Sequence, residues 1–149
     1  MTRTAARELA VALSYAVTLN EQFPDETLDG FFECEYFETL AEENPIFAQY
    51  PDDLQLEYIK RLVTTVYETR VQLDERIARF AVGWKVERIS KTAATILRCA
   101  MTEILCFDDV PASVAINEAV ELAKGYEDED VVSFINGILG SFVRSLEDK

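Results

Sequence analysis

The chain has 149 residues, 49% of them hydrophobic, and a formal net charge of −14. This length suits one compact domain that can bury a core, and the hydrophobic content excludes a disordered chain. No apolar run approaches the ~20 residues that are needed to span a bilayer.

The first predicted element is a helix over residues 4–20, whose apolar side is formed by Leu9, Leu13 and Val17. Arg3 and Arg7 share an edge near its beginning. Two guanidiniums beside the N–H groups of a helix N-terminus are typical of a phosphate clamp, although on composition alone two ordinary surface arginines are the commoner case. The opening segment lacks the apolar stretch of a secretion signal, so we expect a cytoplasmic protein.

A second helix is predicted over residues 26–43, before the Asn44-Pro45 break. Its expected inward side chains are Leu28, Phe31, Phe32, Tyr36, Phe37 and Leu40. A long helical pattern follows over residues 54–82. Because it exceeds the usual length of a globular helix, we expect a break near residues 69–72 that separates an N-terminal lobe, about 1–70, from a C-terminal lobe, about 71–149.

Three further helices are predicted between residues 88 and 144. Ser90 is the expected cap of the first, Pro111 begins the second and Gly125 offers it a left-handed stop. The third carries an apolar stripe of four turns formed by Val131, Phe134, Ile135, Ile138, Leu139, Phe142 and Leu146. Its small-residue edge, Ser133, Gly137, Gly140 and Ser141, predicts the close approach of another helix, with the approach of an RNA backbone as the alternative. No strand pattern occurs, so we expect an all-α fold of two small helical bundles packed across one another, with about seven helices.

The charge and the residue types restrict the function. Residues 20–60 hold twelve acids against the single base Lys60, so the first lobe is strongly acidic. Histidine is absent and the three cysteines lack metal-binding spacing, which leaves no common catalytic or zinc-binding constellation. The acidic run at residues 127–130 fits a helix start better than a metal loop, because it lacks the oxygen spacing of an EF-hand. We therefore expect no enzyme activity, no cofactor and no metal.

The same C-terminal residues carry a family resemblance. The order RISK, ILR, DVP, VAINEAVELAK, ED and FING, between about Trp84 and Arg144, resembles the NusB family of bacterial transcription antitermination and rRNA-synthesis factors. A weaker similarity to the same family occurs in AARELAVALSY near the N-terminus. The resemblance implies a non-enzymatic adaptor of two helical bundles. Such an adaptor pairs with NusE, a ribosomal small-subunit protein, binds boxA RNA and joins the RNA polymerase antitermination complex.

The resemblance also implies particular residues. NusB proteins carry an arginine-rich N-terminus that binds RNA, represented here by Arg3 and Arg7, and the ED and F of the pattern correspond to Asp130 and Phe134. The expected RNA-binding set is Arg3, Arg7, Lys91, Lys124, Asp130 and Phe134. We expect Phe134 at a rim, with one ring face open to stack on a base, although helix periodicity alone would place it in the core.

Tyr15 and Glu103 are the expected contacts to the partner protein. The second hypothesis is an acidic protein-interaction module without RNA affinity of its own. It is favoured by the small number of arginines near the N-terminus.

Overall fold

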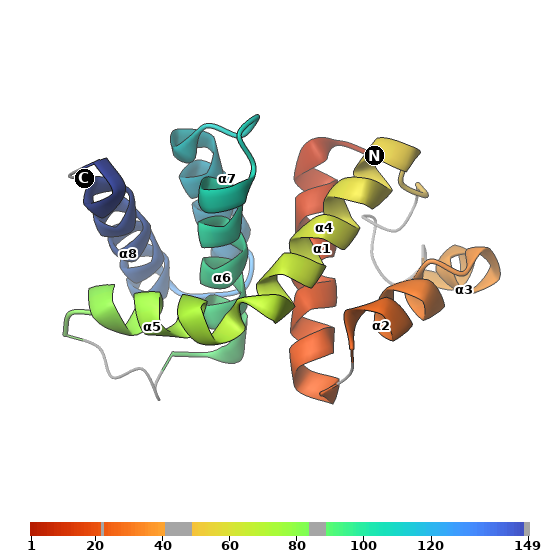
Figure 1. Ribbon diagram of the computed structural model, residues 1–149, viewed down its shortest axis with the longest axis horizontal. Coiled ribbons are helices and arrows are strands. Elements are labelled where there is room, and N and C mark those ends of the chain that lie inside the picture. Colours follow the sequence, from red (N-terminus) through yellow and green to blue (C-terminus); the bar gives the residue numbers. More distant parts are fainter. Residues whose placement is uncertain (22, 41–48, 84–88, 148–149) are drawn as a thin grey trace. The chain divides into compact units, whose positions relative to one another are not determined.

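The computed structural model describes residues 1–21, 23–40, 49–83 and 89–147. These ranges contain eight α-helices and no strand, which confirms the all-α prediction and corrects the expected number of about seven helices (Figure 1). The chain separates into two compact units, Met1–Glu68 and Thr69–Lys149, which we call unit 1 and unit 2.

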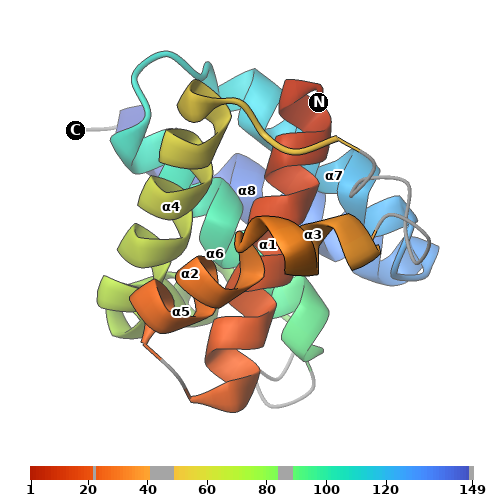
Figure 2. The same cartoon turned by 90° about the vertical axis from the view of Figure 1, so that its right-hand side faces the viewer.

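In unit 1, α1 (Arg3–Asn20) packs against α4 (Asp53–Glu68) and α2 (Pro24–Phe31). Figure 2 shows α2 crossing α1 while α4 runs beside it. The Thr2 hydroxyl accepts the N–H of Ala5 at 3.0 Å and thereby caps the beginning of α1. Asp52 and Gln55 form a reciprocal capping box at the beginning of α4, with bonds of 2.8 and 3.0 Å. The two central helices of unit 1 are therefore fixed by local signals at their N-termini.

The helix predicted over residues 26–43 is two helices, α2 and α3 (Cys34–Leu40), so this prediction was wrong. The side chain of Glu33 accepts the N–H of Tyr36 at 2.9 Å and starts a new helix inside the predicted one. Carboxylates satisfy the free N–H groups of a first turn well, and this side-chain bond competes with helix continuation. The predicted end at residue 43 and the Asn44-Pro45 break lie outside the described residues.

The break between α2 and α3 gathers aromatic rings within unit 1. Phe32 and Phe37 stack at 6.0 Å between ring centroids, and Tyr50 meets Phe37 edge-on at 5.1 Å. The Tyr50 hydroxyl also donates to the Phe32 carbonyl oxygen at 2.9 Å. Tyr36 is instead 50% exposed, which corrects its predicted inward position.

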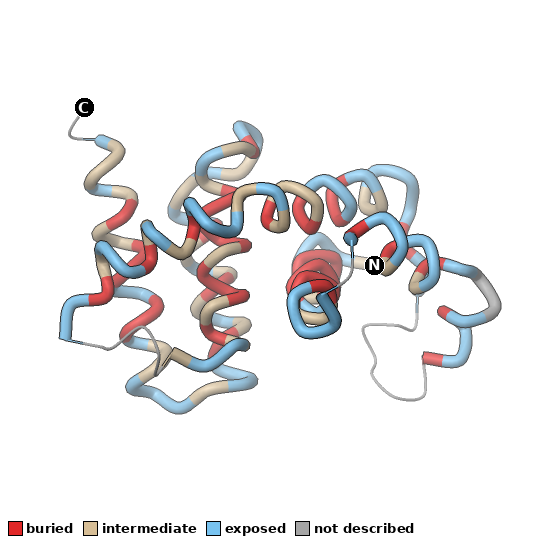
Figure 3. The backbone as a smooth tube through the Cα atoms, turned by 60° about the horizontal axis from the view of Figure 1, so that its bottom comes forward, coloured by how far each residue is buried: buried red, intermediate tan, exposed pale blue. Residues whose placement is uncertain are grey.

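The long helical pattern is interrupted where a break was predicted. The first part is α4, which stops at Glu68, and the second part is α5 (Arg70–Phe80), which begins after Thr69. Unit 2 then consists of α5, α6 (Lys91–Cys106), α7 (Ala112–Lys124) and α8 (Glu129–Glu147), so the three predicted C-terminal helices are confirmed. Buried residues recur along the helices of both units (Figure 3). In unit 2 the central helix is α6, which packs against α5, α7 and α8.

The small-residue edge of α8 is not a helix-packing surface. A Cβ added to Gly137 would meet nothing within 4 Å among the described residues, and one added to Gly140 would meet the Arg144 guanidinium of the same helix at 3.5 Å. The predicted approach of another helix is therefore wrong. This edge faces away from the stripe of α8 that includes Ile135, Leu139 and Phe142, all of which are fully buried.

Candidate nucleic-acid interface

The beginning of α1 presents an oriented arginine. Arg3 is exposed, and its guanidinium carbon lies 3.8 Å from the ring centroid of Tyr58, a residue of α4 that is 5% exposed. The Gln55 amide also donates to the carbonyl oxygen of Met1, which attaches the segment before α1 to α4. A guanidinium stacked on a ring is held in a defined orientation. Arg3 thus combines a fixed position with the partial positive charge of a helix N-terminus.

Arg7 differs from the expectation of two arginines on one surface edge. It is 5% exposed, and its guanidinium carbon lies 5.9 Å from the same Tyr58 ring. The buried side of α1 is wider than the predicted apolar stripe, because Val11 and Ser14 are buried in the same row as Arg7. Of these two arginines, Arg3 is exposed and Arg7 is buried.

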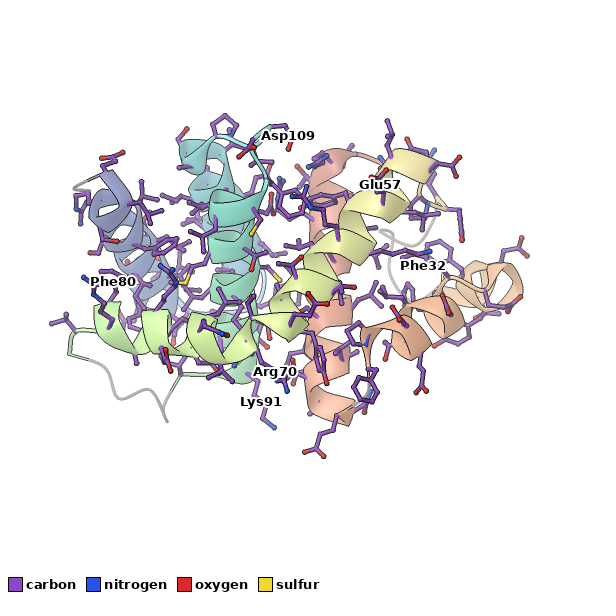
Figure 4. The ribbon with its side chains drawn as sticks, viewed as in Figure 1. Phe32, Glu57, Arg70, Phe80, Lys91 and Asp109 are labelled. Carbon is purple, nitrogen blue, oxygen red and sulfur yellow. The ribbon has the colours of Figure 1, made fainter. Side chains whose placement is uncertain are left out.

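The residues predicted in unit 2 meet at one end of that unit. The Ser90 hydroxyl accepts the N–H of Ala93 at 3.0 Å, which confirms its predicted role as the cap of α6. The same hydroxyl donates to the Glu127 carboxylate at 2.5 Å across 37 residues. This bond brings the beginning of α6, with Lys91, to the segment between Lys124 and Asp130. Figure 4 shows Lys91 pointing away from the beginning of α6, at the opposite end of that helix from Asp109.

Lys91, Lys124 and Asp130 are exposed at this end. The Lys124 ammonium is 2.7 Å from the Glu121 carboxylate, and both side chains are more than half exposed. Such a surface pair contributes little stability, so a phosphate can replace the carboxylate at small cost. The Asp128 carboxylate accepts the N–H of Val131 at 3.1 Å and caps α8, as the helix-start interpretation of the acidic run predicts. No group of acids, cysteines or histidines among the described residues is arranged to hold a metal ion.

Phe134 does not occupy the half-open rim position that we expected. It is 9% exposed and lies among the buried residues of α8 with Ile135 and Ile138. Helix periodicity had placed it in the core, and the structure agrees with that alternative. Only a small part of its ring is open to a base.

The two predicted partner contacts also differ in their accessibility. Tyr15 is half-buried on α1 and keeps surface that a partner could contact. Glu103 is 1% exposed and lies among the buried residues of α6. Glu103 is therefore not the exposed contact that the sequence predicted.

Sequence reasoning missed two residues that organise these sites, Tyr58 and Glu127. Tyr58 supports Arg3 from another helix, and Glu127 joins the segment between α7 and α8 to the beginning of α6 through Ser90. The acidic run gave a signal for capping but none for a bond to a residue 37 positions away. The end of unit 2 offers the exposed cations Lys91 and Lys124 beside exposed carboxylates such as Asp130, which suits binding of a nucleic acid rather than catalysis. The helices that the structure describes include none with the length and apolar character of a membrane span.

Comparisons with known proteins agree with this assessment. The model of the NusB family matches residues 4–144. The transcription antitermination protein NusB of Clostridium acetobutylicum is 36% identical over 149 residues, with full coverage of both chains. That of Acetivibrio thermocellus is 39% identical over 145 residues, covering 97% of this chain and 90% of the relative.

Solved structures resemble this chain along almost its whole length. NusB of T. maritima has a TM-score of 0.76 and 25% identity, covering 97% of this chain and 92% of the other. The structure of the antitermination factors NusB and NusE in complex with double-stranded RNA has a TM-score of 0.73 at 23% identity, with 96% of both chains covered. This second likeness shows the fold alone.

Proposed function

This chain belongs to the NusB family of transcription antitermination factors, and we propose that it binds boxA-type RNA of nascent rRNA leaders jointly with NusE. The observation that carries the proposal is the gathering of Lys91, Lys124 and Asp130 at one end of unit 2 by the Ser90–Glu127 bond. A solved relative of the same fold was crystallised with NusE and RNA, which supports the choice of both ligands. The pair would act within the RNA polymerase antitermination complex.

The charge of the chain explains why a partner is needed. Contacts between cations and phosphates supply most of the affinity for nucleic acid, and a chain at −14 repels RNA over most of its surface. Twelve acids against one base within residues 20–60 make unit 1 the more repulsive part. A basic ribosomal protein bound to this chain would neutralise part of that charge and add phosphate contacts of its own. We propose that Tyr15 contributes to the surface that receives it.

The proposed contacts divide by chemistry. Arg3, Lys91 and Lys124 are exposed cations that would bind phosphate oxygens. The Asp130 carboxylate is an acceptor, so it would bind a base amino group rather than the backbone. Arg7 lies near the Tyr58 ring on which Arg3 stacks, and we propose that Arg7 helps to position this ring. Phe134 is buried one helical turn after Asp130. It would contribute to RNA binding by fixing the position of this part of α8.

Binding of a labelled boxA RNA measured by fluorescence anisotropy tests this proposal. We expect tight binding only when this chain and NusE are mixed, because neither basic surface alone suffices against the acidic charge of this chain. A scrambled RNA of equal length is the control for sequence preference. Equal affinity for boxA RNA in the absence of NusE, or no binding in its presence, would contradict the adaptor function. The latter result, with a stable complex between the two proteins, would favour the acidic protein-interaction module instead.

Arg3→Ala should reduce the salt dependence of RNA binding by the mixed proteins. One lost phosphate contact lowers the slope of log K against log salt by roughly 0.7 to 0.9. The matched control is Arg79→Ala, because Arg79 is also exposed and also lies near a ring, 5.1 Å from the centroid of Phe80. We expect the slope of this control to equal that of the wild type. An Arg3→Ala slope that is unchanged would remove Arg3 from the phosphate contacts.

A further inference from the structure

Tyr126 lies at the end of unit 2 where the proposed RNA contacts gather. It follows Lys124 by two residues and stands between α7 and α8. The residue is 54% exposed, whereas Phe134 on the same proposed surface is 9% exposed. Stacking on a base requires an accessible ring face, so exposure favours Tyr126 over Phe134.

The backbone around Tyr126 is held in a defined turn. The N–H groups of Gly125, Tyr126 and Glu127 donate to the carbonyl oxygens of Leu122, Ala123 and Ala123 at 3.1, 3.0 and 2.8 Å. Gly125 has φ −80°, so the predicted left-handed stop is replaced by a continuing right-handed turn. The Glu127 carboxylate then attaches the turn to Ser90 at the beginning of α6. A ring on a backbone that is already ordered loses little conformational freedom when a ligand binds.

Both cations and acids lie near Tyr126, and the exposed Glu129 and Asp130 follow it in the first turn of α8. Lys124 and Lys91 provide cations on either side of the Ser90–Glu127 bond. Two nearby carboxylates are already engaged, because Glu127 accepts from Ser90 and Asp128 accepts from the N–H of Val131. Glu121 pairs with Lys124 and is the acid that an entering phosphate would displace.

We infer that Tyr126 is the side chain on which this protein stacks an unpaired base of its RNA ligand, while Lys91 and Lys124 bind the adjacent phosphates. The inference rests on the proposed function and deepens it, because it names the ring that contacts a single-stranded nucleotide. Aromatic stacking accepts any base, so this contact supplies affinity, and sequence preference arises elsewhere on the surface, for example at Asp130.

Tyr126→Ala in the full chain, mixed with NusE and a boxA RNA, tests this inference. Loss of one stacked base costs about 1–3 kcal/mol, which corresponds to a rise of about 5- to 150-fold in Kd. The salt slope should stay at the wild-type value, because no charge is removed. Tyr126→Phe keeps the ring and should bind within about twofold of the wild type. Tyr126→Leu keeps apolar surface without a flat ring and should behave like the alanine variant.

RNAs with one abasic nucleotide identify the stacked base. The wild type should lose affinity at one position that the Tyr126→Ala variant no longer distinguishes from the intact RNA. Tyr36→Ala is the matched control, because Tyr36 is 50% exposed on α3 of unit 1, and it should bind RNA like the wild type. Wild-type affinity in both the alanine and leucine variants of Tyr126 would overturn the inference while leaving the proposed function intact. Failure of the wild-type pair to bind RNA would instead remove the proposed function, and the inference with it.

Discussion

Replacing Phe142 by alanine is expected to lower the free energy of unfolding by about 3–5 kcal/mol, the usual cost of emptying a buried phenylalanine site. Phe142 is fully buried on α8. Its ring meets the Phe80 ring edge-on at 6.2 Å between centroids, and the Arg76 guanidinium carbon lies 5.5 Å from its centroid. Truncation would remove both interactions and leave a cavity between α5 and α8. Urea denaturation followed by circular dichroism measures the loss.

Two control variants separate burial from the loss of an aromatic ring as such. Phe142→Leu keeps most of the apolar volume and should cost clearly less than the alanine variant, because volume is better conserved. Phe23→Ala removes a phenylalanine that is 67% exposed and meets Tyr67 edge-on at 6.0 Å. Its expected cost is about 1 kcal/mol or less. A similar loss in Phe142→Ala and Phe23→Ala would contradict the placement of Phe142 in the core of unit 2.

Helices with a local signal at their N-terminus were predictable from the sequence. Ser90 both precedes the apolar stripe of α6 and caps it, and the acids before α8 include the capping residue Asp128. The break at Thr69 was predictable from length alone, because 29 residues exceed a usual globular helix. These signals involve residues that are close in the sequence, so they can be recognised without knowledge of the fold.

Other features depend on which helices surround a residue, and the sequence does not contain that information locally. Arg7 and Glu103 are polar residues that lie within the wide buried sides of α1 and α6, and a polar residue type gives no local indication of such burial. Gly137 and Gly140 suggested a packed edge, but this edge of α8 meets no other helix among the described residues. Burial of α1 and α6 on more than one side is a tertiary property that becomes visible only in the fold.

In the candidate site, too, some features could be predicted from local sequence and others depend on the fold. Lys124, Asp130 and Phe134 are close in the sequence, and the family pattern points to two of them. Lys91 reaches the same end of unit 2 only through the Ser90–Glu127 bond, which spans 37 residues. Tyr126 had no distinguishing pattern, because its relevance comes from 54% exposure within an ordered turn. Residue types can therefore nominate a binding surface, but accessibility decides which ring or charge can contact a ligand.

Phe134→Ala is expected to destabilise the protein by about 3 kcal/mol or more, because the residue is 9% exposed and lies on the buried side of α8. The rim position expected from the family resemblance would instead give a loss of RNA binding with nearly unchanged stability. Urea denaturation and RNA anisotropy on the same preparation distinguish the two expectations. If binding is measured where the variant is still folded, its Kd should rise less than that of Tyr126→Ala.

Phe134→Leu tests whether packing under Asp130 is what matters. Leucine fills most of the buried volume but presents no flat ring, so a core role predicts near wild-type affinity for RNA and a cost below about 1.5 kcal/mol. A stacking role predicts a loss of affinity like that of Tyr126→Leu, with stability retained. Phe134→Leu and Tyr126→Leu both introduce a leucine on the same proposed surface. Their comparison therefore assigns the stacked base to one of the two rings. A weaker RNA complex for Phe134→Leu than for Tyr126→Leu would mean that the small exposed part of Phe134 opens when RNA binds.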